Sequence, residues 1–150
     1  MRAPGAVVAA SVALLAVADP GWAESLDSVV TLGAGYGALG PSGSGTLLVG
    51  RGVQGLYPEV ASGKGAVLRA EAGARGVKGG IGFGQMLVLF TPSPLAMGAS
   101  VRGSAMLLDG ATYLGVEADV ALAARLSLGV FKEVGGRRTT RVTLGVGIGF

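Results

Sequence analysis

The residues best suited to chemistry in this sequence are two acids, Glu117 and Asp119. On a β-strand this spacing puts both carboxylates on one face, which is the arrangement of a paired general acid and base. The chain has no histidine and no cysteine, so the most common general base, thiolate nucleophiles and the usual zinc ligands are excluded. We favour structural ion pairs for these acids, because buried charges are stable only when paired. The sequence therefore predicts no enzymatic activity, no cofactor and no metal site.

Two glycine-rich stretches have the outline of nucleotide-binding motifs. Residues 35–40 match the dinucleotide fingerprint letter for letter, but Pro41 and a Ser/Gly segment follow where a helix is required. Residues 40–46 look like a phosphate-binding loop and lack its lysine. Glycine-rich strands produce both patterns by chance, so we assign neither a function.

The composition predicts one compact domain that does not bind nucleic acid. The chain has 150 residues, of which 50% are hydrophobic, 14% are charged and 29 are glycine. The net charge is +3, and the basic residues are scattered singly except at Arg137-Arg138. A nucleic-acid partner would require a basic stripe, which this pattern lacks.

The N-terminal segment, residues 1–23, predicts a cleaved signal peptide. Arg2 precedes an apolar run from Ala6 to Ala18, and the segment ends in Gly21-Trp22-Ala23, a small-x-small cleavage signal. The apolar run is about 13 residues long, whereas a membrane-spanning helix needs about 20. We therefore expect export, cleavage after Ala23 and a mature domain at 24–150.

The mature chain alternates between apolar and small or polar residues, which indicates β-strands. From 141 to 150 every even-numbered residue is apolar, and every odd-numbered residue is glycine, threonine or arginine. Residues 30–37 repeat this pattern with the same parity. The alternation predicts eight strands, at 29–38, 45–57, 65–76, 80–90, 95–108, 111–122, 125–133 and 138–150. The expected connections are 40–44, 58–64, 77–79, 91–94, 109–110, 123–124 and 134–137.

The connection Asp109-Gly110 fixes a register, because Asp-Gly favours a two-residue hairpin turn. Counting back from that turn, Arg102 faces Glu117 and Ser100 faces Asp119. Arg125 can then reach Asp119 from the next strand.

The two faces of the strands predict a barrel in a membrane. One face is almost purely aliphatic along whole strands, which suits lipid, whereas the other combines glycine with isolated charges, which suits a narrow barrel interior. The expected interior ion network consists of Arg69, Glu71, Arg75, Arg102, Glu117, Asp119, Arg125 and Arg141. The aromatic residues expected near strand ends, as an interfacial girdle, are Tyr36, Tyr57, Phe90, Phe131 and Phe150. Together these features predict an antiparallel, up-and-down, eight-stranded transmembrane β-barrel.

Two polar residues depart from the pattern. Arg51 falls on the apolar parity of its strand, so either a bulge at Gly50 or Gly52 resets the register or the arginine lies at the membrane interface. Gln85 raises the same question in the fourth strand.

These features resemble the small outer-membrane β-barrels of the OmpA and OmpX type. The resemblance covers the whole mature chain as a pattern, and it includes a final strand that ends on Phe150. In those proteins the barrel-assembly machinery recognises the last strand by its terminal aromatic residue. The resemblance therefore implies an assembly signal formed by Leu144, Val146, Ile148 and Phe150. The outer-membrane barrels of this kind that modify lipids typically use a catalytic histidine, which this chain lacks.

The expected function is a structural role in the bacterial outer membrane, in envelope integrity or in contact with lipopolysaccharide. Eight strands leave an interior just wide enough for side chains, which makes a conducting pore less favoured. Four connections should gather basic residues at the outer rim, where they can contact lipid phosphates: Lys78, Lys132, Arg137 and Arg138. The alternative is a soluble periplasmic β-barrel or sandwich that binds a small apolar ligand.

Overall fold

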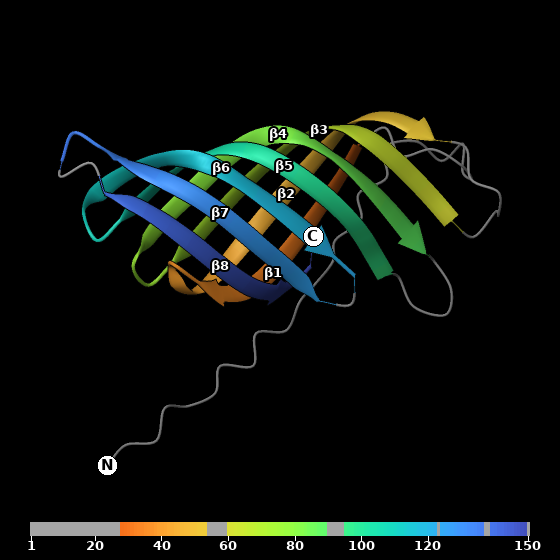
Figure 1. The fold of residues 1–150 in the computed structure, drawn as a ribbon. Helices are drawn as coiled ribbons and strands as arrows, with labels where there is room; N and C mark the ends of the chain where they lie inside the picture. Colours follow the sequence, from red (N-terminus) through yellow and green to blue (C-terminus); the bar gives the residue numbers. More distant parts are fainter. Residues whose placement is uncertain (1–27, 54–59, 90–94, 123, 137–138, 150) are drawn as a thin grey trace, which may run out of the picture.

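The computed structural model describes residues 28–53, 60–89, 95–122, 124–136 and 139–149. These residues form eight strands: β1 (Ser28–Gly37), β2 (Gly40–Val53), β3 (Val60–Gly73), β4 (Gly76–Leu89), β5 (Leu95–Leu108), β6 (Ala111–Ala121), β7 (Arg125–Val134) and β8 (Thr140–Ile148). Each strand pairs antiparallel with the next, and β8 pairs with β1, so the sheet closes into a ring (Figure 1). The prediction of an all-β, up-and-down, eight-stranded barrel is confirmed. The predicted signal peptide lies outside the described residues.

Short turns join the strands at one end of the barrel, which we call the turn end. Asp109 and Gly110 both have positive φ, at 49° and 82°, and the strands on either side pair from Leu108↔Ala111 onward. This is the backbone of a two-residue hairpin turn, which confirms the prediction from the Asp-Gly sequence. The β1–β2 turn occupies residues 38–39, and the β3–β4 turn occupies residues 74–75.

Two of the predicted connections are wrong over their whole length, because they are parts of strands. Residues 40–44 begin β2, where Ser42 and Ser44 point inward. Residues 77–79 belong to β4, where Lys78 points inward. Polar and glycine-rich segments usually indicate loops, but here their polar side chains form hydrogen bonds and ion pairs inside the barrel.

The remaining connections differ from the predictions by a few residues or lie outside the described ranges. The β6–β7 connection is closed by a hydrogen bond of 3.0 Å from the Leu122 amide to the Ala124 carbonyl. β8 begins at Thr140 rather than at residue 138, and the Glu133 amide donates to the Thr139 carbonyl at 2.9 Å. The predicted connection at 58–64 is wrong over residues 60–64, which belong to β3, whereas residues 58–59 and 91–94 are not described.

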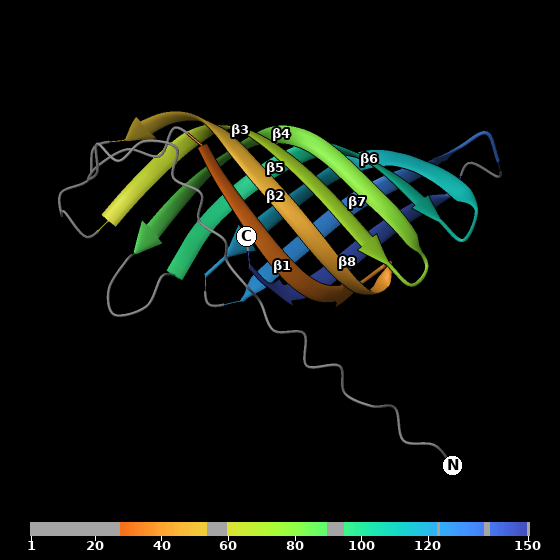
Figure 2. The ribbon, with the colours of Figure 1, turned by 180° about the vertical axis from the view of Figure 1, so that it is seen from behind.

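The closure between β1 and β8 is the shortest pairing in the barrel. It has three residue pairs in the described chain, centred on Gly35↔Gly147, whereas β3 and β4 pair over 14 residues. Figure 2 shows β1 beside β8 at this seam. A β-carbon added at Gly35 would lie 2.6 Å from the Val146 carbonyl oxygen, so the two backbones approach closely. Closure at this seam therefore depends on glycine.

The outer face of the barrel is apolar over most of its area. Large hydrophobic side chains alternate outward on every strand, and Phe83 and Val142 are 77% and 71% exposed. The β2–β3 pairing runs without interruption from Ser42↔Gly73 to Val53↔Ser62, so no bulge resets the register near Arg51. Of the two alternatives for Arg51, the outward-facing arginine is correct.

The interior is apolar at the turn end and polar in the middle. Five buried side chains pack together beneath the turns, and we call them the apolar plug: Leu39, Met106, Leu108, Tyr113 and Phe131. Phe131 is 0% exposed, so its assignment to an outer aromatic girdle is wrong. It shares the inward parity of Arg125 and Ser127 on β7.

Candidate functional site

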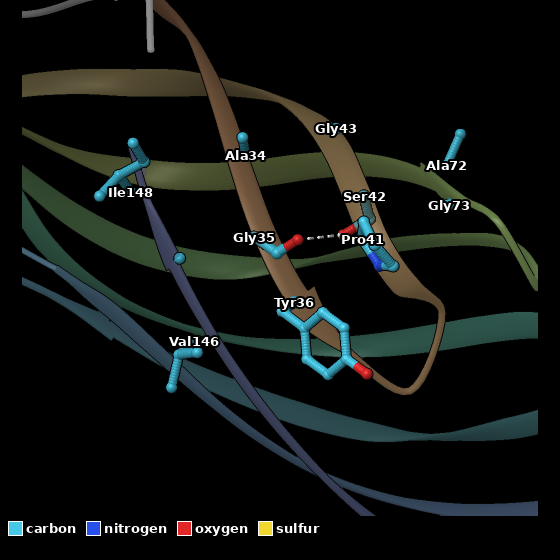
Figure 3. A pocket seen from close by; sticks show the side chains of 11 residues that line it. Ala34, Gly35, Tyr36, Pro41, Ser42, Gly43, Ala72, Gly73, Val146 and Ile148 are labelled. Atoms are coloured by element: carbon cyan, nitrogen blue, oxygen red, sulfur yellow. Dashed lines mark hydrogen bonds between the residues drawn. The ribbon is translucent and has the colours of Figure 1, made fainter. Parts of the chain in front are cut away.

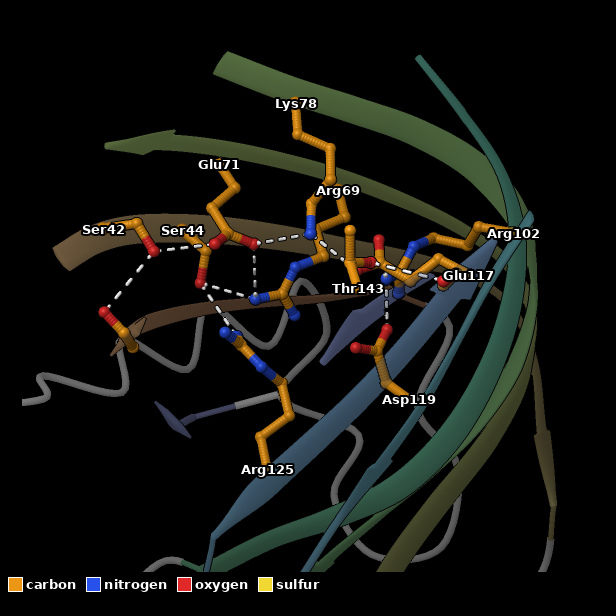
Figure 4. A network of polar contacts seen from close by, with 12 residues as sticks. Ser42, Ser44, Arg69, Glu71, Lys78, Arg102, Glu117, Asp119, Arg125 and Thr143 are labelled. Atoms are coloured by element: carbon orange, nitrogen blue, oxygen red, sulfur yellow. Dashed lines mark hydrogen bonds and ion pairs between the residues drawn. The ribbon is translucent and has the colours of Figure 1, made fainter. Parts of the chain in front are cut away.

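The charged side chains inside the barrel are organised around Arg102 on β5 (Figure 4). Arg102 directly faces Glu117 on β6, which confirms the register counted from the β5–β6 turn. Its Nη2 atom lies 3.3 Å from Glu117 Oε2 and forms a second ion pair with Asp119. Its Nη1 atom donates a hydrogen bond of 2.7 Å to Ser100. One guanidinium therefore serves two carboxylates, and all three groups are at most 3% exposed.

Lys78 extends this network from β6 to β3. Its Nζ atom lies 2.5 Å from Glu117 Oε1 and 3.3 Å from Glu71 Oε2. The same oxygen of Glu71 lies 3.7 Å from Arg69 Nη2. The expectation that Lys78 contacts lipid at the rim is wrong, because β4 begins at Gly76 and directs Lys78 into the barrel.

Hydroxyl groups of β2 complete the network. Ser44 accepts hydrogen bonds from Arg69 at 2.8 Å and from Arg125 at 3.0 Å. Ser42 donates a hydrogen bond of 2.7 Å to Glu71. The network therefore includes two residues that we had assigned to a loop.

Arg125 does not reach Asp119, contrary to the expectation. Its guanidinium extends across β1 toward Ser44, and a β-carbon at Gly35 would lie 3.0 Å from its Nη2 atom. The glycines of β1 leave the space for this path. Among the described residues, no carboxylate lies within 4 Å of this guanidinium.

Arg75 lies outside the network, contrary to the prediction. β3 ends at Gly73, so Arg75 falls in the turn, where its half-exposed side chain pairs with Asp109 of the β5–β6 turn. Its Nε atom donates a hydrogen bond of 3.2 Å to Asp109 Oδ1. The hydrogen bond from Arg75 holds the pKa of the Asp109 carboxyl below its usual value.

Arg141 also stands apart from the ion network. It has the expected inward parity, opposite Phe131, but it lies at the mouth of the barrel and is exposed. Its guanidinium carbon lies 5.3 Å from the centre of the Tyr113 ring, a cation–π contact. Arg141 therefore covers the apolar plug instead of pairing with an acid.

The two acids at the centre of the network are held in a structural arrangement. Glu117 contacts Lys78 and Arg102, and Asp119 contacts Arg102. Glu117 and Asp119 are 2% and 3% exposed, so both carboxylates are buried together with their cations. Removing one partner of a buried pair leaves an uncompensated buried charge and costs about 3–5 kcal/mol, so the folded barrel depends on each pair keeping both of its members.

The turn end of the barrel is closed by backbone hydrogen bonds between successive turns. The Arg75 amide donates to the Leu39 carbonyl at 3.1 Å, and the Asp109 amide donates to the Arg75 carbonyl at 3.0 Å. Three turns are thus bonded in series above the apolar plug. These hydrogen bonds hold the three turns together over the buried side chains of the plug.

A shallow groove lies on the outer wall where β8, β1, β2 and β3 adjoin (Figure 3). Small residues, including Gly43 and Ala72, form its floor, and Tyr36 and Ile148 stand beside them. Tyr36 is 64% exposed. The groove opens away from the interior, so it is a feature of the outer surface.

The expected assembly residues and rim cations are only partly described. Leu144, Val146 and Ile148 point outward from β8, at 69%, 48% and 40% exposed. Lys132 is exposed on the outer face of β7. Phe150, Arg137 and Arg138 lie outside the described residues, as do Tyr57, Phe90 and Ala23.

Lys64 is a candidate functional residue that the sequence analysis did not single out. It lies on β3 directly opposite Arg51, and both side chains are exposed on the outer face. The parity of β3 carried this signal, because Lys64 alternates with the inward Arg69 and Glu71. It was missed because the segment 58–64 was assigned to a connection.

Within the described ranges, no three His, Cys, Asp or Glu side chains gather as a metal site would require. No helix long and apolar enough to cross a membrane is present in those ranges. Comparison of the chain with protein-family models, with curated proteins and with solved structures finds no match.

Proposed function

We propose that this protein is a non-enzymatic, integral β-barrel of the bacterial outer membrane with a structural role in envelope integrity. The precursor is exported by its signal peptide at 1–23 and cleaved after Ala23. The barrel-assembly machinery then recognises the last strand, through Leu144, Val146, Ile148 and Phe150, and inserts the barrel. Its partners in the membrane are lipid and lipopolysaccharide.

The observation that carries this proposal is the inverted polarity of the barrel. A soluble protein buries its apolar side chains and rarely exposes a contiguous apolar surface of more than a few hundred Å². Here aliphatic side chains such as Leu114, Val116 and Val120 are more than half exposed, whereas Arg102 and Glu117 are 2% exposed. Lipid is the solvent that suits such an outer face.

The filled interior supports a structural role over transport. Ion pairs occupy the middle of the barrel, and the apolar plug lies beneath the bonded turns. A pore needs a continuous water path, and a carrier of small apolar ligands needs an apolar cavity. The charged middle suits neither, which also weighs against a soluble ligand-binding barrel.

Strand length also supports insertion. The strands have 9 to 14 residues, and a tilted strand needs about 9–11 residues to cross the hydrocarbon core.

The test compares two arginine substitutions on the outer face of β6. Val116 lies in the middle of the strand, and Thr112 lies near the turn end on the same face. Val116→Arg should destabilise the barrel in lipid vesicles by about 2–4 kcal/mol, whereas Thr112→Arg, as the matched control, should cost about 0–1 kcal/mol. Unfolding by urea in vesicles measures both values.

A soluble barrel would behave differently. Its outer face would contact water, where both substitutions should change stability by less than about 0.5 kcal/mol. Recovery of the mature chain from the soluble periplasmic fraction, folded without detergent, would reject the proposal in favour of that alternative. An inserted barrel should instead require detergent for extraction and migrate faster on a gel before heating than after it.

A further inference from the structure

The charges that point outward from the barrel wall are all positive. Within the described strands, the outward-facing charged residues are Arg51, Lys64 and Lys132. The interior, by contrast, contains acids as well as bases. An outer wall whose charges in the described strands are all cations is matched to an anionic environment.

Two of these cations are adjacent. Arg51 on β2 and Lys64 on β3 are direct cross-strand partners, and Lys64 in turn faces Gln85 on β4. Facing residues have their β-carbons about 5 Å apart, and like charges at such positions repel. In the described part of the chain, no carboxylate lies within 4 Å of either cation. The pair therefore lacks a counter-charge from the described protein.

The row beside this pair is apolar. Two residues closer to the turn end, Val49 faces Ala66, and Ala66 faces Phe83. Phe83 is the most exposed of the large hydrophobic side chains that point outward, at 77%. A polar row of two cations and an amide thus borders an apolar wall, at the end of the barrel opposite the turns.

We propose that Arg51, Lys64 and Gln85 form a binding site for the phosphate of an anionic lipid headgroup. The two cations neutralise the phosphate, and the Gln85 amide can donate a hydrogen bond to it. The acyl chains then lie along Val49, Ala66 and Phe83. This inference rests on the proposed membrane location, and it assigns the site to the end opposite the turns.

The adjacent apolar wall is the reason for choosing a lipid over free phosphate. Free phosphate would gain only the electrostatic contacts, whereas a lipid also gains the apolar contact at Phe83. The position also explains why two like charges face one another in a strand pair: the headgroup bridges them. The two polar residues that interrupt the apolar face, Arg51 and Gln85, therefore belong to one site.

The experiment uses the mature barrel folded in nonionic detergent micelles, observed by amide NMR. The probes are phosphatidylglycerol, phosphatidylcholine and inorganic phosphate, each titrated separately. Phosphatidylglycerol should shift the Gln85 side-chain amide and the backbone amides of Arg51 and Lys64 in a saturable way. Each basic residue near an anionic lipid should contribute about fivefold in affinity, so Arg51→Gln with Lys64→Gln should weaken binding about 25-fold. Arg75→Gln, which removes an exposed cation at the turn end, should change it less than about twofold.

The outcomes separate this site from the membrane proposal. A chain that gives no dispersed amide spectrum in micelles, and folds without detergent, would remove both proposals. A folded barrel on which the double variant binds phosphatidylglycerol as tightly as the wild type would overturn the site alone. Equal affinity for phosphatidylcholine, or for inorganic phosphate, would also overturn it.

Discussion

Arg102 and Glu117 face one another across β5 and β6, with Arg102 Nη2 3.3 Å from Glu117 Oε2. Each has a second ionic partner, because Arg102 also contacts Asp119 and Glu117 also contacts Lys78. The pair is therefore the centre of a branched network that ties β3, β4, β5 and β6 together from inside.

Substitution of Arg102 should destabilise the barrel more than substitution of Glu117. Arg102→Met removes the ion pair of Asp119, so it should destabilise the barrel by about 3–5 kcal/mol. Glu117→Leu should lower the free energy of unfolding by less, because Arg102 still pairs with Asp119 and Lys78 still pairs with Glu71. The double variant should cost less than the sum of the two single variants. Urea unfolding in detergent or lipid measures the cycle.

A distant substitution provides the control for that cycle. Arg75→Gln removes an exposed charge from a turn, and its change in the free energy of unfolding should add to that of Arg102→Met. Strict additivity between Arg102→Met and Glu117→Leu would mean that the two side chains are not coupled.

The packing of the Phe131 ring should require a glycine at residue 115. A β-carbon at Gly115 would overlap the Val130 carbonyl oxygen and lie 2.7 Å from Phe131 Cα. Gly115→Ala should therefore destabilise the barrel by about 1–3 kcal/mol through overpacking. Gly103→Ala is the matched control, because its nearest neighbour would be 3.9 Å away, and it should be neutral or slightly stabilising. Equal urea midpoints for the two variants would contradict the close packing around Phe131.

The ion pair between turns should give a small acid dependence. The Arg75 hydrogen bond lowers the folded-state pKa of Asp109, so its contribution is complete above the unfolded-state value of about 3.9. It is lost as the pH falls through the lower folded-state pKa. Asp109→Asn keeps a residue that tolerates the positive φ. The urea midpoint of the wild type should exceed that of the variant above about pH 5, and the difference should shrink toward pH 2. A constant difference would show that the pair does not titrate in this way.

The terminal residue should matter for assembly in cells. Phe150→Asp should lower the amount of heat-modifiable barrel in the outer membrane, because it removes the aromatic end of the proposed assembly signal. Leu122→Asp, just after the end of β6, tests whether a charge at another exposed apolar position has the same effect. Folding of purified Phe150→Asp in detergent should remain close to that of the wild type. Normal insertion of Phe150→Asp in cells would reject the assembly role.

The predictable parts of this barrel are those in which a local signal has one structural solution. Asp109-Gly110 requires positive φ at successive residues, so it gave the turn, and counting from the turn gave the pairing of Arg102 with Glu117. In the same way, the alternation of apolar residues along β8 predicted which of its side chains point outward.

The sequence-based expectations that fail are those that place polar residues in loops. Ser42, Ser44 and Lys78 are polar because they line a charged interior, and no local pattern distinguishes that from exposure to water. Arg75 was assigned to the interior by parity alone, although its strand ends two residues earlier. The partner of Arg125 depends on the curvature of the closed barrel, which brings the Arg125 side chain of β7 to β2 across β8 and β1. These contacts follow from closure and cannot be counted along one hairpin.

The series of bonded turns at 38–39, 74–75 and 109–110 limits what the turn end offers to other molecules. A protease cleaves a segment that can leave its hydrogen bonds and extend into an active site, and loop tips are the usual targets. Here each of the three turns is two residues long, and its backbone is bonded to a neighbouring turn. These turns therefore provide no extended chain to digest, and an antibody raised against them would recognise a folded surface instead of a linear peptide.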